Sequence, residues 1–433
     1  MTPVEAGIFG IGLLIILILL KMPIAFAMAF VGMIGFGYVA DWSSGFSMLG
    51  REIYASFSSY GLSAITLFVL MGSFAFAGGL GERLYRAAYG LVGDLRGGLS
   101  MATIVGCAGF AAICGSTSAT AAMMGRIALP EMNKYGYKDT LSAGTVTSAG
   151  TLGILIPPST VFIVYAYLTE QSVGRLFLAG IIPGIILAAL FMLGVYLTVL
   201  ANPGLAPPGE RAPLKERIKA GLNAVEALII FVVVIGGLFL GWISPVEAGG
   251  IGAILALIVG ILRRQLTWRS FIDFSKEGLR TAAMILSLIA GAEVFGRFMA
   301  VSTIPFIIGD WVEGLPLSPE AIVAVIVAIF FIGGLFIDAM ALITLVIPVI
   351  YPVVIGLDLN PIWFGVIVVL TANAGVITPP VGVNAYVVKG IAPEIPIGNI
   401  FKGTVPFLIA IVILIALIIL FPQLALFLPE QAA

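Results

Sequence analysis

The stretch from Gly153 to Thr160 reads GILIPPST and lies inside a long apolar segment that would otherwise form one membrane-spanning helix. Adjacent prolines remove two backbone donors and clash with the preceding helical turn. Inside a bilayer an unsatisfied backbone group is costly, so a broken helix persists only where protein or a water-filled cavity receives those groups. The motif is therefore either a simple kink or the marker of a site buried at membrane depth.

Composition indicates an all-α polytopic membrane protein. The chain has 433 residues, of which 61% are hydrophobic and only 10% are charged. A soluble globular chain carries about 25% charged residues. Apolar runs of about 20 residues, the length that crosses a bilayer core, recur along nearly the whole chain.

The charge balance and the missing residue types exclude several functions. A net charge of −1 gives no reason to expect nucleic acid as a partner, and the absence of histidine excludes a histidine proton relay or a histidine-ligated metal. Cys107 and Cys114 lie in one Gly/Ala-rich segment and are predicted to be small buried side chains. We expect no cofactor and no enzyme activity, because no nucleophile occurs with a suitable base.

Basic residues flank the segment 99–133 on both sides. Arg83, Arg86 and Arg96 precede it, and Lys134 and Lys138 follow it. Lysine and arginine favour cytoplasmic loops. The segment is therefore predicted to enter and leave on the cytoplasmic side as a re-entrant helical hairpin with its turn at Gly115–Ser118.

The segment 319–355 shows the opposite pattern. No lysine or arginine occurs from Phe298 to Val388, so this second hairpin is predicted to enter from the outer side. Its middle contains Asp338, the only charged residue between Glu320 and Asp358. A carboxylate inside a membrane segment is a functional candidate by default.

A second broken helix, GVITPPVG from Gly375 to Gly382, repeats the first motif at an offset of 222 residues. Paired Gly/Pro-interrupted helices in an inverted repeat are typical of secondary transporters, whose binding sites lie near the midplane. TPVEAG at Thr2 and SPVEAG at Ser244 are also alike, which we interpret as two similar helix starts.

Each half is predicted to contain an amphipathic segment (45–60 or 266–280), a span, a hairpin, a broken span and a span. The predicted order is a first transmembrane helix (1–22), a first inverted repeat (23–200) with hairpin 99–133 and broken helix 140–168, a connecting loop and helix (201–246), and a second inverted repeat (247–425) with hairpin 319–355 and broken helix 361–388.

Each hairpin turn is predicted to meet one broken helix. The turn Gly115–Ser118 faces the break Gly150–Ser159, and the turn Gly334–Asp338 faces the break Asn373–Thr378. Freed carbonyls suit a hard cation such as Na⁺, and helix N-termini suit an anionic group. We therefore expect two oxygen-rich cation pockets, with an anionic substrate bound between the hairpin tips.

Simpler interpretations apply to several polar residues. The Ser-Thr-Ser turn can serve close helix packing alone, and Asp338 can be paired or reach the surface. Glu293 and Arg297 lie four residues apart and are predicted to neutralise each other. Arg126 either faces an anion or extends to the interface.

Several stretches resemble the large membrane subunit of tripartite ATP-independent periplasmic (TRAP) transporters, of the DctM-like type. They are GSTSATAAMMGRIALPEM, SAGTLGILIPPSTVFIVYA and GRLFLAGIIPG in the first half, and GLFIDAMA and TANAGVITPPVGVNAY in the second. The resemblance covers essentially the whole chain, and the first-half motif is the longer and more specific.

The resemblance implies a Na⁺-coupled symporter that imports an organic anion, of the carboxylate or sialic acid type, across the bacterial or archaeal inner membrane. The expected mechanism is of the elevator type. The expected partners are a periplasmic substrate-binding protein (DctP-like), a separate small four-helix membrane subunit (DctQ-like) and membrane lipid.

The resemblance also implies site residues. Its first sodium site corresponds to Ser116, Thr117, Ser118, Gly150 and Gly153, and its second to Asp338, Asn373, Gly375 and Thr378. Apart from the resemblance, the proline pairs place the helix breaks at Pro157, Pro158, Pro379 and Pro380, and the candidate substrate contacts are Ser118, Ser159 and Arg126.

Other functions stay open at this point. The chain could be a Na⁺- or H⁺-coupled carboxylate carrier that works without a binding protein, and without a sodium response Asp338 would become the candidate proton carrier. An intramembrane hydrolase would need a nucleophile with its base, and a passive channel would not support uphill uptake.

Overall fold

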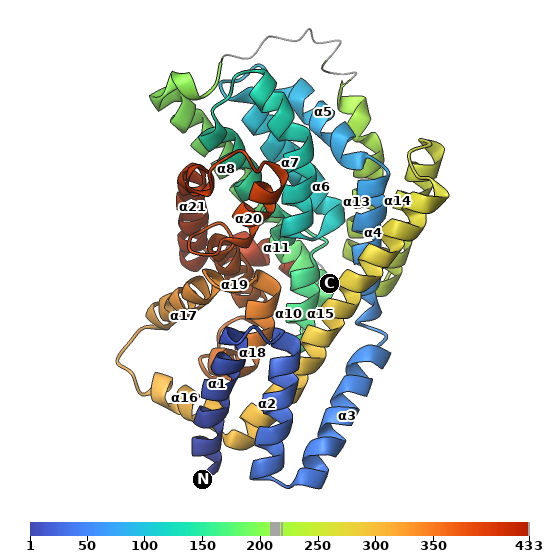
Figure 1. Cartoon of the computed structure of the whole chain (residues 1–433). Helices are drawn as coiled ribbons and strands as arrows, with labels where there is room; N and C mark the ends of the chain where they lie inside the picture. Colours follow the sequence, from blue (N-terminus) through green and yellow to red (C-terminus); the bar gives the residue numbers. More distant parts are fainter. Residues whose placement is uncertain (208–216, 218–219, 432–433) are drawn as a thin grey trace.

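The computed structural model describes residues 1–207, 217 and 220–431, and every regular element in these ranges is a helix (Figure 1). Six of the described helices are long and apolar enough to cross a bilayer, or up to eight if each bent helix pair counts as one span. The all-α polytopic fold is confirmed. Residues 208–216 and 218–219 of the predicted connecting segment (201–246) lie outside the described residues.

The N-terminal part contains five helices. They are α1 (Pro3–Leu19), α2 (Ile24–Val39), α3 (Trp42–Ser58), α4 (Ser63–Ala77) and α5 (Leu80–Val92). Helices α3 and α4 meet at a bend of 48°. The helix α14 (Pro245–Leu262) begins like α1, because Thr2 and Ser244 both form a capping box, which supports the interpretation of their similar motifs as helix starts.

Helix α15 (Trp268–Ser302) is continuous over 35 residues. The sequence predicted a separate amphipathic segment at 266–280, and that prediction is wrong. No helix breaker separates this segment from the apolar part that follows. Gly278, the one glycine near the expected boundary, faces α4, where an added Cβ would lie 3.0 Å from the Ser73 hydroxyl oxygen.

Helix–turn–helix pairs occupy both predicted hairpin segments, with bounds within one residue of those expected, while their entry and return on one side of the membrane stays a prediction. The first consists of α6 (Gly98–Cys114) and α7 (Thr117–Lys134), and the second of α17 (Pro319–Gly334) and α18 (Ala339–Gly356). The left-handed conformation of Gly115, with φ of 65°, ends α6 and turns the chain toward α7. Cys107 and Cys114 are buried free thiols, as expected.

Both predicted helix breaks are present as well. The first broken helix consists of α8 (Asp139–Ala149), α9 (Leu152–Leu155) and α10 (Thr160–Leu168), bent by 43°. The second consists of α19 (Pro361–Gly375) and α20 (Val383–Ile391). Each Pro-Pro pair lies in the non-helical stretch, and both Pro-Pro peptide bonds are cis.

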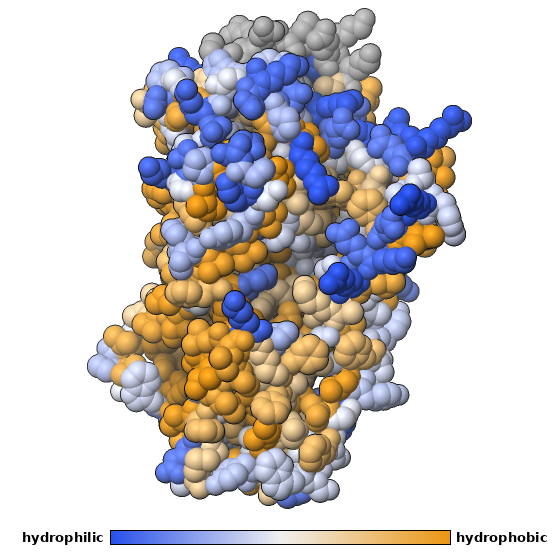
Figure 2. Space-filling view, viewed as in Figure 1, coloured by the Kyte–Doolittle hydropathy of each residue, from blue (hydrophilic) through white to orange (hydrophobic). Residues whose placement is uncertain are grey.

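The remaining described helices complete the bundle. They are α11 (Val173–Ala201), η1 (Pro203–Leu205), η2 (Leu222–Ala224), α13 (Val225–Phe239), α16 (Ile304–Glu313), α21 (Ile397–Leu420) and α22 (Gln423–Gln431). Figure 2 shows hydrophilic residues gathered at the end of the molecule that carries α5, and a broad hydrophobic surface around α1 and α18.

Helices of the N-terminal half pack against helices of the C-terminal half, and corresponding helices of the two predicted repeats make corresponding contacts with the other half. Helix α2 packs on α15 and α14 on α4, while α7 packs on α20 and α18 on α10. Small residues allow the close approach: a Cβ at Gly291 would lie 2.4 Å from the Ala25 carbonyl oxygen. An inverted repeat would give such corresponding contacts, and the repeat relation with its domain bounds stays a prediction.

Candidate functional site

The tip of the first hairpin docks into the first helix break. The carbonyl oxygen of Gly115 accepts a hydrogen bond from the Thr160 hydroxyl at 2.8 Å. Ser116 caps α7 by accepting the Ala119 N–H at 3.4 Å. A Cβ at Gly153 would lie only 2.4 Å from the Ser116 carbonyl oxygen, so this contact requires glycine. The structure therefore brings Ser116 and Gly153 together, as the predicted first pocket requires.

Gly150 and Thr117 extend the same contact. A Cβ at Gly150 would lie 3.1 Å from the Thr117 carbonyl oxygen and 2.7 Å from the Ala121 side chain. The Thr120 hydroxyl donates to the Ser116 carbonyl at 2.7 Å, which orients the backbone of the tip. The carbonyl oxygens of Ser116 and Thr117 thus lie directly against the backbone of the first break.

The tip of the second hairpin docks into the second break in a similar way. A Cβ at Gly375 would lie 2.5 Å from the Gly334 Cα, and the Val381 N–H donates to the Leu335 carbonyl at 3.2 Å. Asp338 caps α18, because its carboxylate accepts the Met340 N–H at 2.8 Å.

Thr378 lies in the second break itself. Its hydroxyl donates to the Ala374 carbonyl at 2.6 Å, and its N–H donates to the Gly375 carbonyl at 3.0 Å. Thr378 thus stabilises the C-terminal end of α19 by hydrogen bonds to two of its last carbonyls. The prolines that follow, Pro379 and Pro380, are exposed, whereas Pro157 and Pro158 of the first break are buried.

Each break has buried polar atoms without hydrogen-bond partners close by, although such atoms also occur elsewhere in the described chain. Among the described residues they include both amide atoms of Asn373, the Ser148 hydroxyl and the Asn384 side-chain oxygen. Buried polar groups in proteins are nearly always hydrogen-bonded, so such atoms are suited to a bound ion or water. Spare oxygens of this kind fit a hard cation such as Na⁺.

Ser148 and Asn384 were not predicted from the sequence. A signal existed for Ser148, because Ser148-Ala-Gly before the first break matches Asn373-Ala-Gly before the second. No local signal marks Asn384, which becomes notable only through its contacts in the folded chain.

A cavity of about 1050 Å³ lies between the two hairpin tips. Its wall includes Ser116–Ala119 of the first tip, Asp338–Ala341 of the second tip, and Arg126 on α7. Its opposite wall comes from α2, α4 and α15. The structure thus brings Ser118 and Arg126 to one cavity at the predicted position between the tips.

Ser159 does not reach this cavity. It is fully buried, its hydroxyl donates to the Ile154 carbonyl at 2.6 Å, and the same oxygen accepts the Phe162 N–H at 3.3 Å. Ser159 thus caps α10 and holds the break, while the neighbouring Thr160 lines the cavity.

Four helix N-termini line the cavity. The first turns of α2, α7, α10 and α18 all contribute lining residues. A helix N-terminus carries a partial positive charge and free N–H groups, which favour an anion. Arg126 is the one basic residue among the described lining residues, and its guanidinium lies 6.0 Å from the centre of the Phe76 ring.

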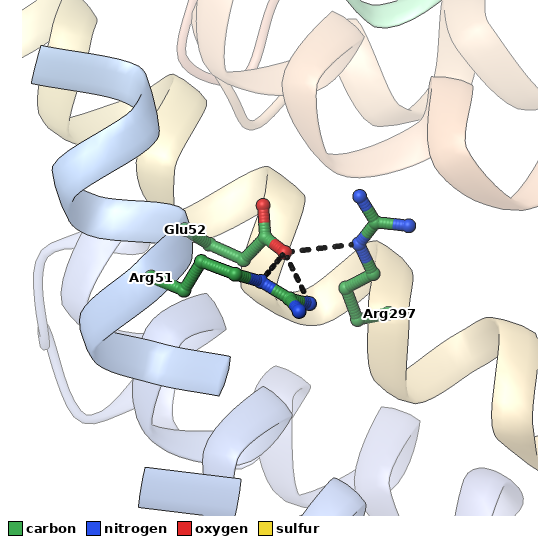
Figure 3. Close-up of polar contacts among 3 residues, drawn as sticks. All are labelled: Arg51, Glu52 and Arg297. Carbon is green, nitrogen blue, oxygen red and sulfur yellow. Dashed lines mark hydrogen bonds and ion pairs between the residues drawn. The ribbon is translucent and has the colours of Figure 1, made fainter. Parts of the chain in front are cut away.

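Arg297 does not pair with Glu293, and that prediction is wrong. Figure 3 shows the Arg297 and Arg51 side chains directed at the same oxygen of Glu52, at 3.2 and 3.0 Å. Glu52, on α3, is only 6% exposed, so two guanidinium groups compensate its buried charge. The partner of Arg297 comes from another helix, which the spacing within α15 could not reveal.

Nearly the whole chain is similar to proteins of one transporter family. Residues 11–424 match the family described as tripartite ATP-independent periplasmic transporter, DctM component. The chain belongs to this family. It is therefore a TRAP transporter large permease subunit, a membrane-embedded transport protein and not an enzyme.

Relatives within the TRAP family carry different substrate names. The C4-dicarboxylate TRAP transporter large permease protein DctM of Pseudomonas aeruginosa is 34% identical over 88% of this chain and 89% of its own length. The sialic acid TRAP transporter large permease protein SiaM of Vibrio cholerae is 30% identical over 94% of this chain and 95% of its own length.

A solved structure shares the fold at low sequence identity. The Alcanivorax borkumensis YdaH transporter matches with a TM-score of 0.65 at 15% identity, over 90% of this chain and 89% of its own. At this identity the similarity concerns the fold alone, and it agrees with the all-helical transporter architecture.

Proposed function

We propose that this TRAP permease subunit imports an organic anion together with Na⁺ across the bacterial or archaeal inner membrane. The observation that carries the proposal is the cavity between the hairpin tips, where four helix N-termini and Arg126 meet. These groups favour a negative charge at membrane depth. A carboxylate or sialic acid fits this chemistry and the substrates named for the relatives.

Sodium coupling is proposed from the two docked breaks. Ser116, Thr117, Ser118, Gly150 and Gly153 would hold one ion. Asp338, Asn373, Gly375 and Thr378 would hold the other, and the spare oxygen of Asn373 supports this second set. A bound cation adds positive charge beside the cavity and favours the anion. Substrate must bind more tightly to the ion-loaded state, because a ligand shifts a population only by its differential affinity.

An elevator mechanism is proposed for the crossing step. The cavity lies between the hairpin tips on one side and α2, α4 and α15 on the other. A ligand bound at this boundary is carried across the membrane if the hairpins and broken helices slide as one body along α2, α4 and α15. The tight backbone contacts at Gly153 and Gly375 support movement of tips and breaks together.

Two further proteins are proposed as partners. A tripartite transporter of this family implies a small four-helix membrane subunit and a periplasmic substrate-binding protein beside the large subunit. The alternative is a Na⁺- or H⁺-coupled carboxylate carrier that needs no binding protein. The family match favours the tripartite form.

Uptake into proteoliposomes tests the proposal. The purified complex of large and small subunits would be supplied with its periplasmic protein and radioactive carboxylates or sialic acid. We expect uphill uptake that requires an inward Na⁺ gradient and the periplasmic protein. Uptake without that protein would favour the alternative carrier, and uptake that only equilibrates would indicate a channel.

A further inference from the structure

Asn384, near the start of α20, contacts both helix breaks. Its backbone N–H donates to the Val376 carbonyl at 3.1 Å, and its side-chain N–H donates to the Thr147 carbonyl at 3.3 Å. Val376 is the C-cap of α19 at the second break, and Thr147 lies in the last turn of α8 before the first. One residue thus joins two breaks that lie far apart in the sequence.

The two accepting carbonyls are groups that the breaks release. The last carbonyls of a helix have no partner within the helix. Val376 stands at such an end. In a continuous helix the Thr151 N–H would donate to the Thr147 carbonyl. In the first broken helix it donates to the Ser148 carbonyl instead, at 2.9 Å, so the Thr147 carbonyl has lost its helical partner. Asn384 therefore satisfies one released carbonyl at each break.

Packing alone does not explain an amide at this position. Asn384 is 0% exposed, and its side-chain oxygen has no hydrogen-bond partner. A buried polar atom without a partner loses its hydrogen bonds to water and destabilises the folded state. Leucine has the same branched side-chain skeleton with no polar atoms, so it would avoid that penalty. The amide at this buried position therefore points to a function of its link between the breaks.

We propose that Asn384 couples the two cation pockets, so that Na⁺ in one pocket raises the affinity of the other. This inference rests on the proposed sodium coupling. A cation coordinated by the carbonyls of one break fixes the backbone at that break. Because the two hydrogen bonds of Asn384 join the breaks, the backbone of the other break is then held in place as well. Such coupling is reciprocal between the sites.

Equilibrium binding of radioactive Na⁺ to the purified complex of large and small subunits tests the inference. In the wild type we expect a Hill coefficient above 1, and in Asn384→Leu we expect it to fall to about 1. Thr404→Val is the matched control. The Thr404 hydroxyl donates to the Ile377 carbonyl at 3.1 Å and so supports only the second break. This variant should keep the Hill coefficient of the wild type.

A double-variant comparison isolates the coupling. Asp338→Asn weakens the second pocket, and in an otherwise wild-type chain it should also lower Na⁺ affinity at the first pocket, by about 5- to 150-fold. In the Asn384→Leu background the first pocket should no longer respond. Asn384→Ser, whose short side chain cannot reach Thr147, repeats the test if the leucine variant does not fold.

The outcomes separate the inference from the proposed function. Wild-type cooperativity in both Asn384 variants would overturn the inference, and so would an equal loss in Thr404→Val. A Hill coefficient of 1 in the wild type would overturn the inference alone. Absence of Na⁺ binding to the wild type would overturn both this inference and the sodium coupling.

Discussion

The two helix breaks share a Pro-Pro pair but differ in burial and in charge. At the first break both prolines are buried and the hairpin tip offers neutral hydroxyls at Ser116–Ser118. At the second break both prolines are exposed, and the tip offers the carboxylate of Asp338. Where no charge is available, a pocket depends on the exact fit of many weak ligands. The first pocket should therefore be sensitive to shape and the second to charge.

The largest effect is expected from Gly153→Ala. Its Cβ would lie 2.4 Å from the Ser116 carbonyl oxygen, and backbone cannot move aside as a side chain can. Overpacking typically costs about 1–3 kcal/mol. We expect loss of substrate uptake and a lower unfolding temperature. Gly398→Ala, where nothing lies within 4 Å of the new Cβ, is the control and should behave as wild type. Normal uptake by Gly153→Ala would show that the tip does not dock closely during transport.

Replacement of each proline pair should reduce substrate uptake to a different extent at the two breaks. In the Pro157→Ala/Pro158→Ala variant the restored N–H groups let the helix close over the break. Thr160 would then leave the Gly115 carbonyl, which it now reaches at 2.8 Å. We expect uptake to be abolished.

The matched variant Pro379→Ala/Pro380→Ala changes an exposed pair and should reduce uptake less. Substrate uptake measured in parallel for the two double variants shows which break depends more on its prolines. Equal losses would contradict the distinction between a shape-dependent and a charge-dependent break.

Asp338→Asn should act on ion affinity and not on folding. Asparagine caps a helix about as well as aspartate, so the Met340 contact that starts α18 can persist. Loss of the charge should raise the Na⁺ concentration for half-maximal uptake by about tenfold or more, since each tenfold change corresponds to about 1.4 kcal/mol. An unchanged Na⁺ dependence of uptake would exclude Asp338 as an ion ligand.

The smallest effect is expected from Ser118→Ala. Ser118 is one of several neutral oxygen donors at the first tip, and unlike Ser116 it does not cap α7. The loss of one hydroxyl ligand should raise the Na⁺ concentration needed for uptake by less than Asp338→Asn does. The same uptake titration measures both variants, and a larger shift for Ser118→Ala would reverse the proposed roles of charge and shape.

Local sequence signals were sufficient for the hairpins and the breaks. Glycine at Gly115, the caps Ser116 and Asp338, and the two proline pairs fix where helices start and stop, so those bounds agree closely with the structure. The membrane side on which each hairpin enters, which the flanking charges predict, stays a prediction.

Contacts between distant segments were not predictable in the same way. The Glu52–Arg297 ion pair and the Asn384–Thr147 hydrogen bond join elements that meet only in the folded bundle. The continuity of α15 through 268–302 was missed because polarity changes along the helix, whereas a helix end needs a breaker or a cap.

Thermal unfolding of the purified complex in NaCl, KCl and choline chloride, at equal ionic strength, is the decisive measurement for cation pockets at the helix breaks. A ligand at about one hundred times its dissociation constant adds about 2.7 kcal/mol to stability. We predict stabilisation by Na⁺ alone, which Asp338→Asn reduces and Gly398→Ala leaves unchanged. Equal unfolding temperatures in the three salts would contradict sodium sites at the breaks and make Asp338 the proton carrier to test.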